Sequence, residues 1–127
     1  MMISQRASAL VAVVEDDPAC RIALGRLLRA EGFDVALFES AEAYLGAAVP
    51  APPVCVIVDV QLPGMSGLDL QRRLHDEGNG TPVILMTGAS EMSVQTRAER
   101  IGCAKFFWKP VDSDALLETL ASITRHC

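Results

Sequence analysis

The sequence predicts one α/β domain in which a sheet of five parallel strands carries helices on both faces. Two observations support this fold class. Short apolar runs that fit buried strands alternate five times with segments of helical periodicity. The chain also has 127 residues, half of them hydrophobic, which suffices for one core without disulfides or structural metal. We therefore expect a single domain over residues 1–127, with its core at about 9–125 and a loose segment at 1–8.

The first unit consists of a strand at 10–14 and a helix that starts at Asp17 and Pro18. Aspartate is a frequent N-cap residue, proline is a frequent first helical residue, and Gly32 fits the end of this helix. The second strand is expected at 33–37. The apolar face of the helix contains Cys20, Ala23, Leu24, Leu27 and Leu28.

The second helix is short, at about 40–46, and a proline-rich segment then leads to the third strand at 55–59. This strand is a continuous apolar run, which is typical of a strand buried on both faces of a parallel sheet. A Pro-Gly turn follows it. Ser66 and Asp69 then have the spacing of a capping signal for a helix at 67–76.

The last two units repeat the alternation. A strand at 82–86 precedes a helix at about 90–101, which Gly102 ends. A strand at 104–108 precedes the last helix, for which Asp112 is the expected cap. The inward side chains of that helix are expected to be Leu116, Leu117, Leu120 and Ile123.

Polar side chains follow four of the five strands. Glu15 and Asp16 come after the first strand and Asp59 ends the third. Thr87 and Lys109 follow the fourth and fifth strands. Because the carboxyl ends of parallel strands meet at one edge of a sheet, where α/β folds bind ligands, we expect these five side chains to converge.

Three carboxylates in one crevice repel one another, and a hard divalent cation such as Mg²⁺ (or Mn²⁺) is their natural partner. A carboxylate can also act as a nucleophile and form an aspartyl phosphate, while a lysine and a hydroxyl stabilise the phosphoryl oxygens. We expect Asp59 to be the phosphoryl acceptor, and Lys109 and Thr87 to contact the phosphoryl oxygens. The expected metal ligands are Glu15, Asp16, Asp59 and the backbone carbonyl of Gln61.

The ordered motifs resemble the receiver domain of two-component response regulators over essentially the whole chain, from 11 to about 123. They read Val-Val-Glu-Asp-Asp-Pro, Val-Asp-Val-Gln-Leu-Pro-Gly-Met-Ser-Gly, Leu-Met-Thr-Gly and Trp-Lys-Pro. The resemblance implies a flavodoxin-like fold with strand order 2-1-3-4-5. It also implies transfer of a phosphoryl group to Asp59 from a sensor histidine kinase or a histidine phosphotransfer protein. Glu15 stands where the family more often has aspartate, and in the family the positions of Gln61 and Ala89 tune hydrolysis.

The resemblance also implies a switch. Phosphorylation would draw Thr87 toward the phosphoryl group and let Phe106, at the aromatic switch position, turn inward. The surface of the fourth helix, fifth strand and fifth helix would then repack, control a partner or output domain and support a homodimer. The family further implies a cis peptide between Lys109 and Pro110. Ile22 points away from the core face of its helix, so we expect it to contact the kinase or the phosphotransfer domain.

Other side chains are given structural roles. Phe107 is expected in the core, because alternation along its strand sends it to the face opposite Phe106. We expect Met86 to serve packing, and His75 and His126 to lie on the surface.

Composition limits the class of protein. The formal charge of −5 argues against direct binding of nucleic acid by this segment. The four cysteines are far apart and fit small hydrophobic residues in a reducing cytosol. Because the chain shows neither a secretory signal nor a transmembrane run, we expect a cytoplasmic protein without membrane contact.

Two alternative functions remain beside phosphoryl acceptance. A haloacid-type phosphatase needs a second acid two residues after its nucleophile, where this chain has Gln61. We therefore expect no enzyme, only slow self-phosphorylation and self-dephosphorylation. A pseudo-receiver would be a phosphorylation-independent interaction module, yet such domains usually lack one of the key residues, and none is missing here. The sequence does not distinguish a stand-alone regulator from a receiver excised from a longer one, whose output could be a helix-turn-helix domain.

Overall fold

Five strands and five helices alternate along the chain in the computed structural model, which describes residues 9–47, 52–88 and 92–125. The strands are β1 (Leu10–Val14), β2 (Asp34–Phe38), β3 (Cys55–Asp59), β4 (Val83–Thr87) and β5 (Lys105–Trp108). The helices are α1 (Pro18–Ala30), α2 (Ala41–Gly46), α3 (Gly67–Asp76), α4 (Met92–Ile101) and α5 (Ser113–Arg125). None of the helices in these ranges is long and apolar enough to span a membrane.

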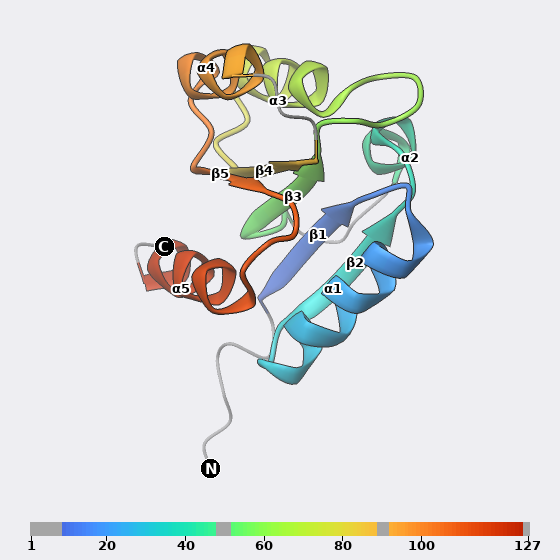
Figure 1. Cartoon of the computed structure of the whole chain (residues 1–127), viewed down its shortest axis with the longest axis vertical. Coiled ribbons are helices and arrows are strands. Elements are labelled where there is room, and N and C mark those ends of the chain that lie inside the picture. Colours follow the sequence, from blue (N-terminus) through green and yellow to red (C-terminus); the bar gives the residue numbers. More distant parts are fainter. Residues whose placement is uncertain (1–8, 48–51, 89–91, 126–127) are drawn as a thin grey trace.

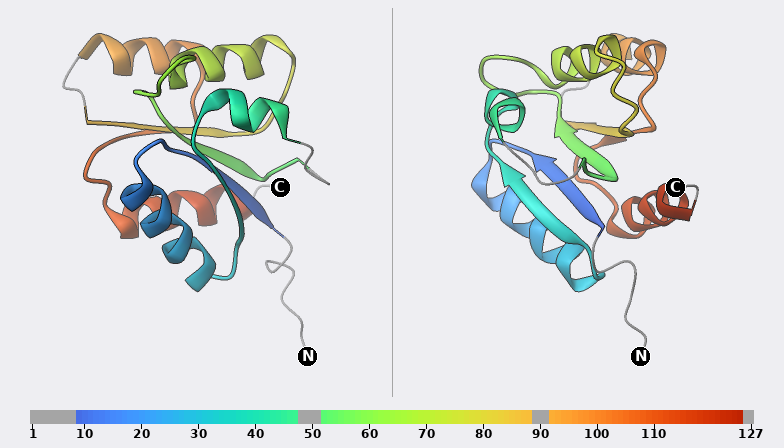
Figure 2. Two further views of the ribbon diagram at one scale, coloured as in Figure 1. Left: turned by 90° about the vertical axis from the view of Figure 1, so that its right-hand side faces the viewer. Right: turned by 180° about the vertical axis from the view of Figure 1, so that it is seen from behind.

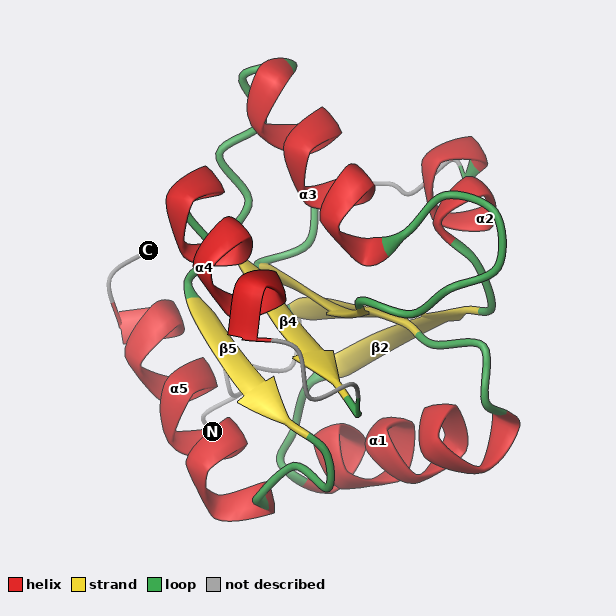
Figure 3. Cartoon of the chain, turned by 45° about the horizontal axis from the view of Figure 1, so that its top comes forward, coloured by secondary structure: helices red, strands yellow, loops and turns green. Residues whose placement is uncertain are grey.

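The strands form one parallel sheet in the order β2-β1-β3-β4-β5, as expected (Figure 1). Val11 lies between Val35 and Cys55, and Asp59 lies opposite Met86. Figure 3 shows the arrowheads of β4 and β5 pointing in the same direction. The residues that follow the strands therefore gather at one edge of the sheet.

The sheet lies between two layers of helices, which the edge-on view in Figure 2 shows. Helices α2, α3 and α4 cover one face, and α1 and α5 cover the other. Strand residues alternate between the two cores, so the central strands are apolar along their whole length. The core beneath α3 and α4 contains Ala12, Val14, Val56, Val58, Leu68, Leu70, Leu85 and Val94. The core beneath α1 and α5 contains Val11, Val13, Leu24, Leu28, Ile57, Ile84, Met86, Leu116 and Leu120.

Short-range capping bonds start four of the helices at the positions that the sequence predicts. Asp17 accepts a hydrogen bond from the Ala19 N–H, at 3.3 Å. Ser40, Ser66 and Asp112 accept from backbone N–H groups two or three residues further on. These caps satisfy donors that a helix leaves unpaired.

Three strands and one face assignment differ from the sequence prediction: β2, β4 and β5 each start one residue later, and β2 and β4 also end one residue later. Strand β2 starts one residue later, because the N–H of Phe33 bonds the Leu28 carbonyl at 3.1 Å and so closes the preceding helix. Strand β4 starts after Pro82, which has no N–H for the ladder, and β5 likewise starts one residue later, at Lys105. Ala23 is exposed rather than inward, because the face of α1 that meets the sheet is formed by Leu24, Gly25 and Leu28. The predicted start of the fourth helix near 90 lies outside the described residues, as does the segment 1–8.

Gly67 brings the start of α3 against the end of β3. Its N–H donates to the Val60 carbonyl at 2.9 Å. A Cβ at this position would lie 2.8 Å from the Val60 Cα and closer still to the Asp59 carbonyl oxygen. Only glycine permits this approach, which fixes the strand that ends in Asp59.

Candidate functional site

Three carboxylates meet at the carboxyl ends of β1 and β3. Each of Glu15, Asp16 and Asp59 offers an oxygen that lies within 4.8 Å of those of the other two. Glu15 is fully buried and Asp59 is 4% exposed, while Asp16 faces solvent. The predicted convergence of the acids is confirmed, and one of them remains open to a ligand.

Lys109 reaches the acids from the end of β5. Its Nζ donates to Glu15 Oε1 at 2.7 Å and to Asp59 Oδ2 at 2.8 Å. The backbone N–H of Lys109 bonds the Thr87 carbonyl at 2.8 Å, which holds the end of β5 against β4. The peptide between Lys109 and Pro110 is cis, as expected. One cation thus joins two buried carboxylates from different strands.

Burial and charge shift the pKa values at this point. Burial raises the pKa of Asp59, hydrogen bonds from Lys109 and the Gln61 N–H oppose the rise, and the nearby Glu15 adds to it. Burial alone would lower the pKa of Lys109, but the contacts with Asp59 and Glu15 outweigh it and raise that pKa. Lys109 is therefore a fixed cation at physiological pH.

Asp59 is also fixed from its own loop. Its Oδ1 accepts a hydrogen bond from the Gln61 N–H at 2.9 Å, so the backbone of Gln61 lies beside the carboxylate. Asp16, Asp59 and the Gln61 carbonyl are all hard oxygen donors, the type that Mg²⁺ prefers. The residues present therefore fit the expected metal.

Two side chains that sequence reasoning missed hold the loops of the site. Arg21 Nη1 donates to the carbonyl oxygens of Glu15 at 2.8 Å and Asp16 at 3.3 Å, so α1 holds the backbone of the acidic pair. Glu42 of α2 accepts from the Met65 N–H at 2.8 Å and so holds the loop after β3. A long cationic residue one turn after an N-cap was the available signal for Arg21; no local signal marks Glu42.

The predicted switch residues lie on adjacent strands beside the site. Thr87 is fully buried, one residue beyond Met86, the register partner of Asp59. Phe106 packs against the core beneath α3 and α4, and its ring contacts that of Trp108 edge-on at 5.1 Å. Phe107 packs against the opposite core, as alternation predicts.

Some of the remaining predicted positions lie within the described residues and others lie outside them. Ile22 is 47% exposed on α1, and His75 is exposed on α3. Met86 is buried, as expected. Ala89 and His126 lie outside the described residues, as does Cys127. The other cysteines lie in or beside the core: Cys20, Cys55 and Cys103.

Comparisons with known proteins identify the family and agree with the fold. The family model of the response regulator receiver domain matches residues 11–121. The chain belongs to this family. It is a receiver domain with a role in two-component signalling, and the alternative of a pseudo-receiver finds no support in these matches.

The curated relatives are longer proteins. The chain is 39% identical over 116 residues to the transcriptional regulatory protein FixJ of Azorhizobium caulinodans, covering 91% of this chain and 55% of FixJ. It is 37% identical over 118 residues to nodulation protein W of Bradyrhizobium diazoefficiens, covering 93% and 52%. This receiver domain thus spans about half the length of the curated relatives that it matches.

Solved structures agree with the fold. The crystal structure titled FixJ-N superposes with a TM-score of 0.84 at 29% identity and covers 94% of this chain and 96% of that one. The response regulator StyR superposes with a TM-score of 0.83 at 34% identity, covering 91% and 58%.

Proposed function

We propose that this receiver domain accepts a phosphoryl group on Asp59 in a Mg²⁺-dependent reaction. The observation that carries the proposal is the double contact of Lys109 Nζ with Asp59 and Glu15, at 2.8 and 2.7 Å, beside the exposed Asp16. This arrangement supplies a nucleophile, a fixed cation and an oxygen-rich pocket at one point.

The reaction is a displacement at phosphorus. An Asp59 oxygen forms a bond to the phosphorus while the bond to the donor nitrogen of a phosphohistidine breaks, and the imidazole leaves. Lys109 stays in contact with the transferring oxygens and neutralises their charge, and the Thr87 hydroxyl hydrogen-bonds one of them. Glu15, Asp16, Asp59 and the Gln61 carbonyl would hold Mg²⁺ or Mn²⁺, and the bound ion would neutralise further charge.

The proposed donor is a sensor histidine kinase or a histidine phosphotransfer protein that docks on α1. Ile22 is exposed there, and a hollow of about 490 Å³ opens nearby, between Leu24 of α1 and Val111 before α5, with Lys109 in its wall. We expect Ile22→Asp to slow transfer from the kinase while the reaction with acetyl phosphate is unchanged. Kinase transfer at the wild-type rate would contradict this docking surface.

Phosphorylation is proposed to act on the surface of α4, β5 and α5. Thr87 is buried and Phe106 is half-buried on neighbouring strands. Movement of one side chain therefore changes the space in which the other can pack. The repacked surface would control an output domain or form a homodimer, because the matched relative FixJ is a transcriptional regulatory protein about twice as long as the aligned region. A Thr87→Ala variant that is phosphorylated and still switches normally would contradict the coupling.

The phosphorylated state is proposed to decay slowly by self-hydrolysis, without action on other substrates. Gln61, two residues after the acceptor, is exposed and carries no acid that could activate water as in a haloacid-type phosphatase. A cytoplasmic location and the lack of direct nucleic-acid binding by this segment stay predictions.

Intact mass measurement tests the central proposal. The protein is incubated with acetyl phosphate, with and without Mg²⁺, beside the Asp59→Asn variant as control. We expect a gain of one phosphoryl group that requires both Mg²⁺ and Asp59. A wild-type protein that gains no mass, or an Asp59→Asn protein that gains the same mass, would overturn it.

A further inference from the structure

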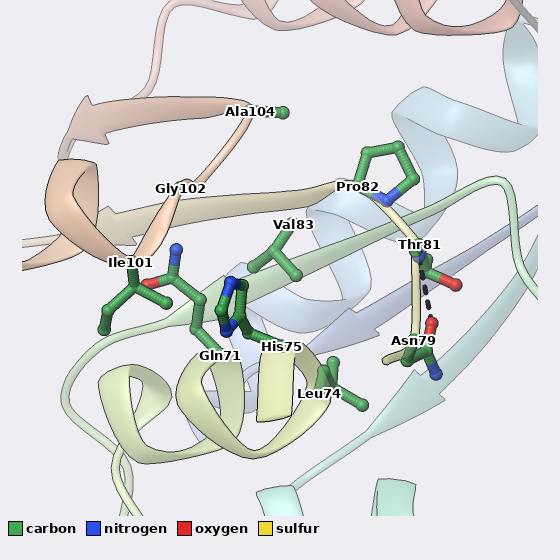
Figure 4. Close-up of a pocket in the computed structure, with 11 residues that line it drawn as sticks. Gln71, Leu74, His75, Asn79, Thr81, Pro82, Val83, Ile101, Gly102 and Ala104 are labelled. Atoms are coloured by element: carbon green, nitrogen blue, oxygen red, sulfur yellow. Dashed lines mark hydrogen bonds between the residues drawn. The ribbon is translucent and has the colours of Figure 1, made fainter. Parts of the chain in front are cut away.

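A second hollow lies at the opposite edge of the sheet from Asp59, where β4 begins. Its volume is about 330 Å³, and it is bounded by the end of α3, the start of β4 and the turn after α4 (Figure 4). Gln71, His75, Asn79 and Thr81 contribute polar atoms to its wall, and Pro82 contributes an apolar face. None of these side chains belongs to the phosphorylation site.

Gln71 presents an unusual acceptor in this hollow. The residue is 3% exposed, and its Nε2 donates to the Ala98 carbonyl at 3.1 Å, which fixes the orientation of the amide. Its Oε1 is buried and has no hydrogen-bond partner in the described part of the chain. In Figure 4 the amide rises from α3 toward the end of α4, where Ile101 lies. A buried acceptor without a donor favours a ligand that brings one.

Arginines line an adjoining hollow of about 340 Å³, which shares His75 and Ile101 with the first. They are Arg72 of α3 and Arg97 and Arg100 of α4. Arg97 and Arg100 stand three residues apart on one helix and so share a face.

The charge of this hollow is positive and unpaired. Within residues 9–47, 52–88 and 92–125, no carboxylate lies within 4.0 Å of any of the three guanidinium groups. The wall contains one carboxylate, Asp76, whose Oδ1 lies 3.5 Å from His75 Nδ1. Three of the eleven basic side chains of an acidic chain therefore gather at one point.

We propose that these two adjoining hollows, here called the α3–α4 groove, bind a nucleoside phosphate. Guanidinium groups match phosphate oxygens with paired hydrogen bonds, which places the phosphate at Arg72, Arg97 and Arg100. The base then lies in the first hollow against Ile101, toward which the Gln71 amide points, and donates an amino hydrogen toward Gln71 Oε1. Each hollow has the volume of an ordinary small-molecule site.

The test is a titration of the whole chain, followed by backbone amide NMR shifts at Thr81 and Gly102, in buffer that contains EDTA and no Mg²⁺. The probes are ATP, GTP, adenosine, guanosine and inorganic pyrophosphate. We expect at least one nucleotide to bind with shifts at both residues. The matching nucleoside and pyrophosphate should each bind about tenfold more weakly, because each fills one hollow only.

Matched variants locate the site. The double variant Arg97→Ala with Arg100→Ala should weaken nucleotide binding at least roughly tenfold. The control removes the same charge from exposed positions of α1, as Arg26→Ala with Arg29→Ala, and should change nothing. Gln71→Met keeps the side-chain volume and should weaken the nucleotide without weakening pyrophosphate.

Three outcomes would overturn the proposal. In the first, no nucleotide binds at millimolar concentration. In the second, pyrophosphate binds as tightly as every nucleotide, which would show an unspecific anion-binding surface. In the third outcome, the α1 control variant weakens binding as much as the groove variant, which would show an effect of net charge alone. Because the three arginines are exposed, their variants are expected to fold.

Discussion

At the carboxyl edge of the sheet the charged groups are buried and joined, whereas at the α3–α4 groove they are exposed and unpaired. Glu15 and Asp59 have almost no contact with solvent, and Lys109 Nζ contacts both. Arg72 and Arg97, on the far side of α3 and α4, have no carboxylate within 4.0 Å in the described residues. A buried charge destabilises the fold unless an opposite charge compensates it, whereas an exposed charge is solvated by water and needs no partner. Variants at the two places should therefore differ sharply in their effect on stability.

The largest expected effect follows from Lys109→Met, which keeps the length of the side chain and removes the cation. Glu15 and Asp59 then remain buried side by side without compensation. We expect the free energy of unfolding at pH 7 to fall by about 3 kcal/mol, the lower end for a broken buried pair, because a quarter of the Lys109 side chain is exposed. Urea denaturation measures this, with the exposed Lys105→Met as a control that removes the same charge from β5.

The pH dependence gives this prediction a second readout. Burial raises the pKa of Asp59 in the folded state, so its contribution to stability is complete below its unfolded pKa and is lost as pH rises through its folded pKa. Without Lys109, the hydrogen bond that lowers the pKa of Asp59 disappears, so the loss of stability with rising pH becomes larger. The deficit of Lys109→Met should therefore shrink as the pH is lowered into the range where Asp59 becomes protonated. A deficit that is the same at all pH values would contradict the buried-charge explanation.

Gly67→Ala tests how tightly the carboxyl edge is packed. The added Cβ meets backbone atoms of Asp59 and Val60, which cannot move aside as a flexible side chain would. We expect a loss of about 2 kcal/mol in the free energy of unfolding and slower phosphorylation, because the end of β3 must shift. Gly46→Ala is the matched control: nothing lies within 4 Å of its added Cβ, so stability should stay level or rise by up to about 1 kcal/mol. Equal effects at the two glycines would contradict the argument.

The sequence predicted those parts of the molecule that depend on local chemistry or on parallel topology. Caps such as Asp17 and Ser66 are local, and the meeting of Asp16, Asp59 and Lys109 follows once the strands are parallel. Boundaries shifted where one backbone bond decided them, as at Phe33.

Contacts made by long side chains with distant backbone were not predictable. Glu42 bonds an N–H group 23 residues away, and this contact leaves no periodic pattern in the sequence. The same holds for Gln71, whose partner on α4 is 27 residues away.

Arg21→Lys should separate positioning from charge at the acidic edge. The variant keeps the positive charge but loses the planar group that bonds the carbonyls of Glu15 and Asp16 together. We expect Mg²⁺ to bind roughly fivefold more weakly, because the loop that carries both acids is less fixed. Fluorescence of Trp108, the only tryptophan of the chain and the neighbour of Lys109, measures the affinity. Arg26→Lys on the same helix is the control, and unchanged affinity in Arg21→Lys would show that the carbonyl contacts play no positioning role.

The smallest effect is expected at the exposed arginines of the α3–α4 groove. Arg97→Gln removes a cation that has no carboxylate within 4.0 Å in the described chain and that shares its helix face with Arg100. Since no pair is broken and one like-charge contact is relieved, the free energy of unfolding should change by less than about 0.5 kcal/mol. Urea denaturation beside Lys109→Met measures it under the same conditions. A loss comparable with that of Lys109→Met would mean that Arg97 has a partner in the folded state, and the contrast between paired and unpaired charge would fail.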